Sequence, residues 1–484
     1  MVEVELKFQI TPARRQALLK ALDPKKCENI QLQAKYYDTA EKHLAQQHVA
    51  LRQRLEGQNW VQTLKAAKEN HIERFEHNHD LGLLAVAPDL QLEIYSQDAE
   101  ASAILKRALG EYSNALELQF ETDIQRTLRV IHFAQSEIEV SLDIGCIRSL
   151  HGEIEVHEVE FELKSGSIQD LLAFSFEWVK KFGLWLDVRS KAEMGNLLAS
   201  QQTVSPATTV NAFQLVKKDS SEKSLRALIA QQLQHLLPNI AAISAQVATP
   251  EHIQQAQQAL EHLQLTTSLF KDWNKNLSDK FSLQLGAFKQ QFDQLQHLEH
   301  MQATLGGFLQ NASTKEQLEK DILYAKEKLG HLVRSTQNVH HYLELMMFSL
   351  SEDQSAQDLR QSAQNSLQQQ YRTLNDQLLE SDVHHFESLD ALAQRIHELK
   401  FSFPILTHIY DVKNLQKYSK ALNDAYLAAQ EYQVLASSAL YIQNTELEAS
   451  DWFVLGWLTA KQEVYAERLL EATEQFMVSR KLIK

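Results

Sequence analysis

The sequence has few of the residues that define several common classes of protein. Its two cysteines, Cys27 and Cys146, are too few for a disulfide framework and form no CxxC pair that would bind zinc. No apolar run approaches the roughly 20 residues of a membrane-spanning helix. A glycine-rich P-loop is also missing. Basic residues are outnumbered, so the net charge of −15 disfavours nonspecific binding to nucleic acid or anionic membranes. We therefore expect a cytoplasmic protein that binds neither nucleic acid nor membranes.

The 484 residues fall into two parts with different hydrophobic periodicity. Before about residue 200, short runs alternate between apolar and polar residues, as half-buried strands do. These runs are Leu51–Leu55, Trp60–Lys65, Ile72–His79, Ile138–Asp143 and Glu153–Lys164. Ser167 and Gly183 predict the start and end of a helix over Ile168–Phe182. A second short helix is expected from Lys191 to about Ser200.

The second part of the chain is rich in Ala, Leu, Gln, Lys and Glu. Residues 201–212 (QQTVSPATTVNA) are small and polar, which indicates a linker. Beyond them, apolar residues recur at helical spacing, as in Leu225, Ile229 and Leu233. We expect about eight to ten helices there, arranged as one bundle or two. The predicted class is α+β, with domains at residues 1–200 and 213–484 joined by the linker 201–212.

The ionic faces of the predicted strands carry both signs of charge. In the first strand Glu3, Glu5 and Lys7 point to one face, while Val4 and Leu6 point to the other. The same pattern returns in Arg52 and Arg54, Lys65, Arg74 and Glu76, Arg126, Glu139 and Asp143, and Glu158, Glu160, Glu162 and Lys164. One such strand is most simply a solvated face. Its recurrence in many strands favours a shared ionic surface.

A shared ionic surface of this kind suits a metal–polyphosphate complex. Carboxylates are hard oxygen ligands for Mg²⁺ or Mn²⁺, and arginine and lysine complement phosphate. If the sheet closes into a barrel, the ionic faces line a central tunnel. Part of the apolar outside would then be covered by the two predicted helices.

The sequence resembles the CYTH superfamily, the triphosphate tunnel metalloenzymes, over about residues 1–200. Glu3-x-Glu5-x-Lys7 is similar to the family's ExExK signature. Further blocks in the family's order are Tyr36-Tyr37-Asp38-Thr39, Leu51-Arg52-Gln53-Arg54, Thr63-Leu64-Lys65, Glu158-Val159-Glu160-Phe161-Glu162 with Ser165-Gly166, and Ser190-Lys191. Two positions depart from the pattern: Met194 stands where many relatives have arginine, and Asn78 where a second acid is expected.

The resemblance implies an eight-stranded antiparallel barrel whose lumen holds a triphosphate and one or two Mg²⁺ or Mn²⁺ ions. It implies that phosphate is bound by Lys7, Arg52, Arg54, Lys65, Arg74, Arg126 and Lys191. Metal would be held by Glu3, Glu5, Asp143, Glu158 and Glu160, with Glu76 and Glu162 beside them. The expected reaction is attack of water on a terminal phosphorus. Lys65 and Tyr36 match a pair considered as water activator, although carboxylates around Lys65 would hold its proton.

A CYTH part followed by a long helical part resembles the CYTH–CHAD architecture. CHAD domains are helical, contain histidines and are associated with polyphosphate. The local clusters worth testing are His331 with Arg334, and His397 with Arg395 and Lys400. The architecture implies an inorganic triphosphatase. Alternatives are a thiamine or nucleoside triphosphatase, a class IV adenylate cyclase, or a polyphosphate-binding protein without catalysis.

Overall fold

The computed structural model describes residues 2–68, 70, 72–209, 212–275, 277, 279–305, 312–352, 357–409, 415–444 and 449–478. The chain forms two compact units. The first comprises Met1–Thr209, Leu233–Ala256 and Gly330–Ser351, and the second comprises Val210–Gln232, Gln257–Leu329 and Glu352–Lys484. The first unit thus includes two later segments of the chain, Leu233–Ala256 and Gly330–Ser351. The domain limits 1–200 and 213–484 remain a prediction.

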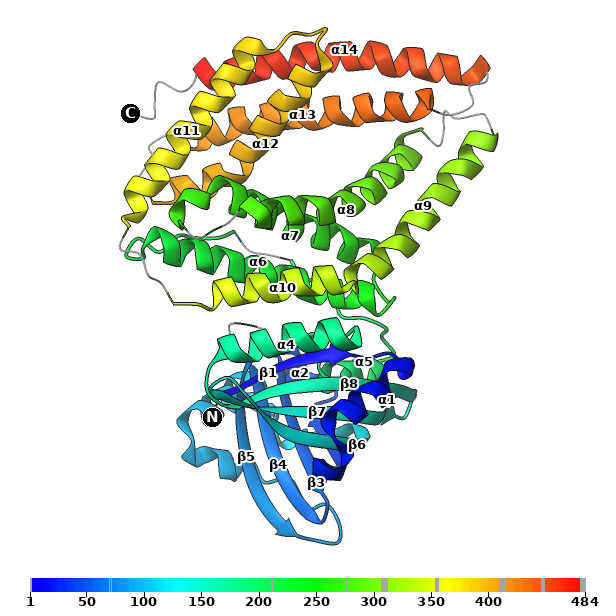
Figure 1. The fold of residues 1–484 in the computed structure, drawn as a ribbon, viewed down its shortest axis with the longest axis vertical. Coiled ribbons are helices and arrows are strands. Elements are labelled where there is room, and N and C mark those ends of the chain that lie inside the picture. The colour runs from blue at the N-terminus through cyan, green and yellow to red at the C-terminus, as the bar shows by residue number, and fades with distance from the viewer. Residues whose placement is uncertain are drawn as a thin grey trace. The chain divides into compact units, whose positions relative to one another are not determined.

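The first unit contains an antiparallel β-barrel (Figure 1). Its strands are β1 (Val2–Gln9), β2 (Glu28–Asp38), β3 (Val49–Glu56), β4 (Asn59–Ala67), β5 (Glu73–Leu83), β6 (Glu117–Phe133), β7 (Ser136–Ser149) and β8 (Gly152–Ser165). They lie in the order β5-β4-β3-β2-β6-β7-β8-β1, and pairing of β1 with β5 closes the barrel. The predicted eight-stranded barrel is confirmed. A two-residue strand, β9 (Trp185–Leu186), adds to β1.

The apolar outside of β1 and β8 is covered by helix α4 (Ile168–Phe182). Phe161 of β8 packs against Phe174 and Trp178 of α4, with ring centroids 5.2 and 5.6 Å apart. The predicted bounds of α4 are confirmed. Ser167 Oγ accepts a hydrogen bond from the Asp170 amide at 3.1 Å, and Gly183 ends the helix with a φ of 62°.

Other short helices cover the rest of the barrel. They are α1 (Pro12–Leu22), α2 (His43–Gln46), α3 (Ala99–Leu109) and α5 (Lys191–Ala199). α3 buries Ile104 and Leu105 in a cluster with Leu51, Leu64 and Phe75, which point outward from β3, β4 and β5. Because outward residues alternate with inward ones, Arg52 and Lys65 must then point into the lumen.

Helix α5 closes an apolar end of the lumen. Tyr36 and Phe120 lie on the inward faces of β2 and β6, and they form one buried cluster with Met194 of α5. Met194 thus packs into this cluster. Gly195 permits the close approach, because a Cβ there would lie 2.2 Å from the Phe120 ring.

Nine helices follow in the described parts of the chain. They are α6 (Ser221–Ser244), α7 (Pro250–Leu269), α8 (Asp279–Leu305), α9 (Ala312–Val333), α10 (Thr336–Ser349), α11 (Leu359–Glu380), α12 (Phe386–Thr407), α13 (Leu415–Gln443) and α14 (Ala449–Val478). The predicted all-α region is confirmed. Within the first unit α10 packs on α4, where His340 Nε2 lies 3.1 Å from the Phe176 carbonyl oxygen. Within the described residues no helix is long and apolar enough to cross a membrane.

We expect Gly195→Ala to destabilise the barrel by about 1–3 kcal/mol, because the added methyl group overpacks α5 against Phe120. The measurement is the midpoint of chemical unfolding. Gly456→Ala is the matched control, since it adds a methyl group to the helix α14 where nothing lies within 4 Å. That control should be neutral or stabilising by up to about 1 kcal/mol. Equal effects at the two positions would contradict the assignment of Gly195 to close packing.

Candidate metal and phosphate site

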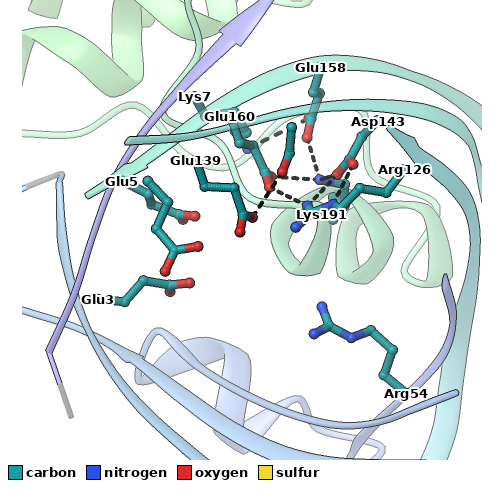
Figure 2. A network of polar contacts seen from close by, with 12 residues as sticks. Glu3, Glu5, Lys7, Arg54, Arg126, Glu139, Asp143, Glu158, Glu160 and Lys191 are labelled. Carbon is teal, nitrogen blue, oxygen red and sulfur yellow. Dashed lines mark hydrogen bonds and ion pairs between the residues drawn. The ribbon is translucent and has the colours of Figure 1, made fainter. Parts of the chain in front are cut away.

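The barrel encloses a cavity of about 1360 Å³ lined by the ionic faces of its strands. Figure 2 shows carboxylates from β1, β7 and β8 on one side of the site and Arg54 reaching toward them from the other. The lining includes all the predicted site residues except Glu158. The structure thus brings together side chains from β1, β2, β3, β4, β5, β6, β7, β8 and α5.

Three carboxylates on β7 and β8 form the tightest acidic group. Asp143, Glu158 and Glu160 each offer an oxygen atom, and these atoms all lie within 4.8 Å of one another. Lys191 Nζ lies 2.8, 2.7 and 2.8 Å from oxygen atoms of the three in turn (Figure 2). Arg126 donates two hydrogen bonds of 2.7 Å to Asp143 and also binds Glu160. The strand register explains the cluster, since Asp143 lies opposite both Arg126 and Glu158.

Glu158 is the deepest acid of this group and is fully buried. Lys7 Nζ lies 3.7 Å from its Oε1, and Gln9 Nε2 donates to the same atom at 3.4 Å. Its Oε2 is near Lys191 but outside hydrogen-bonding geometry with any described residue. Its charge is balanced by the Lys191 ammonium group, 2.7 Å away.

A second ionic group surrounds Lys65 on β4. Lys65 Nζ donates to Glu3 Oε2 at 2.6 Å and lies 3.4 Å from Glu76 Oε1. Arg52 approaches Glu76 at 3.9 Å, and Arg74 approaches Glu5 at 3.3 Å. The acids of β1 thus contact basic residues of β4 and β5. The first residues of β1 pair with β5, and the rest of the strand pairs with β8.

Glu3 and Glu76 hold their protons very differently. Burial raises the pKa of Glu3 to about 7, because the charge of Lys65 offsets the loss of water only in part. Burial would also raise the pKa of Glu76, but the charges of Lys65 and Arg52 outweigh it and lower that pKa to about 2. Near neutral pH the Glu76 carboxylate is therefore fully ionised, whereas the Glu3 carboxylate is about half-protonated.

Positive charge accumulates on the side of β3 and β6. Burial, together with repulsion from Arg52 and Arg126, lowers the pKa of Arg54 despite its ion pair with Glu56. Burial is the larger cause of this lowered pKa, and the two neighbouring cations add to it. An anion bound among these guanidinium groups would relieve the repulsion.

The two predicted water activators are perturbed in opposite senses. Burial disfavours the charged form of Lys65, but Glu3, Glu5 and Glu76 outweigh it and raise the pKa. Tyr36 Oη accepts a hydrogen bond from Arg52 at 3.2 Å. Burial alone would raise the pKa of Tyr36, yet the charges of Arg52 and Lys191 lower it. Lys65 is therefore a poor base near neutral pH, and Tyr36 is the more acidic partner.

The structure adds residues that the motif comparison omitted. Lys164 bridges Glu139 and Glu162 at 3.4 and 2.9 Å and lines the same cavity. Arg189 also lines it, held by the buried Asp187 at 2.8 Å. Strand alternation already places Glu139 and Lys164 on the ionic faces of the predicted strands. Arg189 lies outside any predicted strand, so only the fold reveals it.

The clusters proposed in the helical region do not converge on a common site. His397 pairs with Glu261 at 3.0 Å, Arg395 with Glu398 at 2.7 Å, and Lys400 donates to Asn423 at 2.9 Å. Arg334 lies over the ring of Trp185. These side chains contact separate protein groups.

Comparison with known proteins shows what the barrel resembles. Residues 1–187 match the CYTH domain family. An inorganic triphosphatase of Haemophilus influenzae is 33% identical over 207 residues, which are 41% of this chain and 56% of that protein. The chain thus spans little more than half the length of this relative. The CHAD domain of Ricinus communis covers 57% of this chain and 99% of its own, with 13% identity and a TM-score of 0.49.

We expect Arg126→Met to destabilise the metal-free protein by about 3–5 kcal/mol, because it removes one of the two cations that neutralise the buried Asp143 and Glu160. Unfolding in the presence of EDTA is the measurement. Arg148→Met is the control, since Arg148 pairs with Glu153 at the surface and is 54% exposed. Its loss should leave the midpoint of unfolding close to that of the wild type, because exposed ion pairs contribute little. Similar losses for both variants would show that the lumen is not a desolvated environment.

Proposed function

We propose that the barrel hydrolyses inorganic triphosphate (tripolyphosphate) to pyrophosphate and phosphate with Mg²⁺ or Mn²⁺. The main support is the convergence of a carboxylate cluster and crowded arginines on one cavity. A metal–triphosphate complex carries both signs of charge. Its cation would bind the carboxylates, and its phosphate groups would bind the arginines. The CYTH match and the triphosphatase relative support the same reaction class.

The acids fit a divalent cation. Asp143, Glu158 and Glu160 supply hard oxygen atoms within 4.8 Å of one another. We assign the metal ligands from the set Glu3, Glu5, Glu76, Asp143, Glu158, Glu160 and Glu162. A cation bound there would neutralise phosphate charge and lower the pKa of a water ligand.

The basic residues would hold the triphosphate in line for attack by water. We assign this role to Lys7, Arg52, Arg54, Lys65, Arg74, Arg126 and Lys191. Water attacks the terminal phosphorus, the bond to the bridging oxygen breaks, and pyrophosphate leaves. Fixed cations stabilise the charge that spreads over the phosphoryl oxygens. Lys65 remains protonated and contributes its charge, and we assign Tyr36, which Arg52 holds at 3.2 Å, to orient the attacking water. The water proton leaves with the phosphate product.

An organic triphosphate is the second candidate substrate. The cavity extends beyond the charged strands to Gln202, Asn239 and His252, which are largely uncharged. Such a polar region could hold a thiamine or nucleoside group. Among the described residues of the helical region, the proposed basic clusters contact separate protein groups and do not converge on one site, so we assign no polyphosphate site to them.

The deciding experiment measures phosphate release from tripolyphosphate, ATP and thiamine triphosphate with Mg²⁺, Mn²⁺ or EDTA. We expect rapid release from tripolyphosphate with metal and none with EDTA. Glu5→Gln should lower kcat/KM at least about 100-fold. Glu155→Gln, on the same barrel but with a side chain 80% exposed, should be unaffected. Preference for an organic triphosphate would select the second candidate, and binding without hydrolysis would leave only a binding protein.

Metal affinity should increase as the pH rises toward 7. Glu3 has a pKa raised to about 7, so below this pH a cation must displace its proton. We expect Mn²⁺ affinity to rise by up to about tenfold per unit between pH 5.5 and 7 and then to level off. Calorimetry in buffers of different ionisation enthalpy measures both the affinity and the proton released. Glu3→Gln should remove this proton release; its persistence would exclude Glu3 as the titrating group.

A further inference from the structure

The wall of the cavity extends past the barrel into the segment that follows it. Residues 202–208, between α5 and α6, contribute Val204, Ser205 and Thr208 to the lining. α6 contributes Asn239 and α7 contributes His252. All these residues belong to the first compact unit. We call residues 202–208 the strap.

The strap is fixed at one end by a reciprocal pair of hydrogen bonds. The Thr208 amide donates to Asn239 Oδ1 at 3.1 Å, and Asn239 Nδ2 donates to the Thr208 carbonyl oxygen at 2.9 Å. Asn239 is fully buried in α6. A buried amide that satisfies both backbone groups of one residue specifies the position of the strap.

His252 binds the centre of the strap, and its hydrogen bonds define which ring nitrogen carries the proton. The Thr249 amide lies 3.2 Å from His252 Nδ1, and because a backbone amide only donates, Nδ1 must accept. Nε2 then carries the proton and donates to the Ser205 carbonyl oxygen at 3.0 Å. His252 is only 3% exposed, so this bond is shielded from water.

Ser205 connects the strap to the helix that carries Lys191. Its hydroxyl group donates to Glu193 Oε1 at 2.6 Å. The Glu193 amide donates to Ser190 Oγ at 3.0 Å in the first turn of α5. Lys191 lies between these two residues and contacts three carboxylates within 2.8 Å. The start of α5 is thus held by its cap and from outside by the strap.

We propose that Ser205 and His252 are positioning residues for Lys191 in the proposed hydrolysis. α5 spans nine residues and is too short to be rigid by itself. Lys191 must nevertheless reach three acids and a phosphate group, where a shift of about 1 Å costs as much as 100-fold in rate. The hydroxyl of Ser205 and the imidazole of His252 supply the missing restraint. The first helices after the barrel are then part of the active site.

The test uses full-length variants and tripolyphosphate with Mg²⁺. Ser205→Ala should lower kcat/KM about tenfold, mainly through KM. Ser205→Thr keeps the hydroxyl group and should stay within about twofold of the wild type. His252→Ala should also lose activity, and His252→Gln, which keeps a donor, should recover part of it. Thr203→Ala is the matched control, because Thr203 is exposed and does not line the cavity. Thermal unfolding checks that each variant folds.

A double-mutant cycle separates positioning from general damage. If Ser205 acts through Lys191, Ser205→Ala should change kcat/KM less than about twofold in a Lys191→Met background. An equal loss in both backgrounds, or a Ser205→Ala variant as active as Thr203→Ala, would overturn the proposal. The affinity for tripolyphosphate is measured by calorimetry for the same four proteins: the wild type, Ser205→Ala, Lys191→Met and the double variant. A wild type that binds without hydrolysis would refute the proposed function alone, and the binding cycle would still decide the role of Ser205.

Discussion

The fold depends on neutralising charges that the barrel removes from water. Isolated carboxylates would be very costly in such an interior, so each strand can face inward only if a cation from another strand meets it. Lys191 illustrates the constraint, because one ammonium group contacts Asp143, Glu158 and Glu160 at once. Arg126 secures the same acids from β6. Closure of the barrel and assembly of the site are therefore one event.

This neutralisation also prepares the lumen for a ligand. The protein's own cations occupy the carboxylate oxygen atoms that a divalent metal would take under the proposed function. Metal binding would release Lys191 and Arg126 to contact phosphate. On the opposite side, Arg54 already lies among other arginines and pairs with Glu56. Acid and base walls that are fixed before binding avoid reorganisation during the reaction.

Helix α5 both closes the apolar end of the lumen and places a cation in its polar part. Met194 and Gly195 close the apolar end of the lumen against Phe120, while Lys191 of the same helix enters the polar part. The strap that holds this helix belongs to neither the strands nor the helical bundle. A segment with the composition of a linker therefore also shapes the cavity, and its hydrogen bonds to Asn239 and His252 explain why it has a defined course.

Period-two alternation in the sequence determined which side chains share the inner face, because successive residues of a strand point to opposite sides. It predicted Glu3, Arg52, Lys65 and Glu160 as lumen residues, and the capping residues set the bounds of α4. Only the tertiary structure decided which charges pair. Glu3 meets Lys65 across 62 positions of sequence, and that contact and its burial set the pKa of Glu3. The roles of Arg189, Ser205 and His252 depend on contacts between segments without a periodic pattern. Local sequence cannot encode such distances, since they arise when separate elements pack.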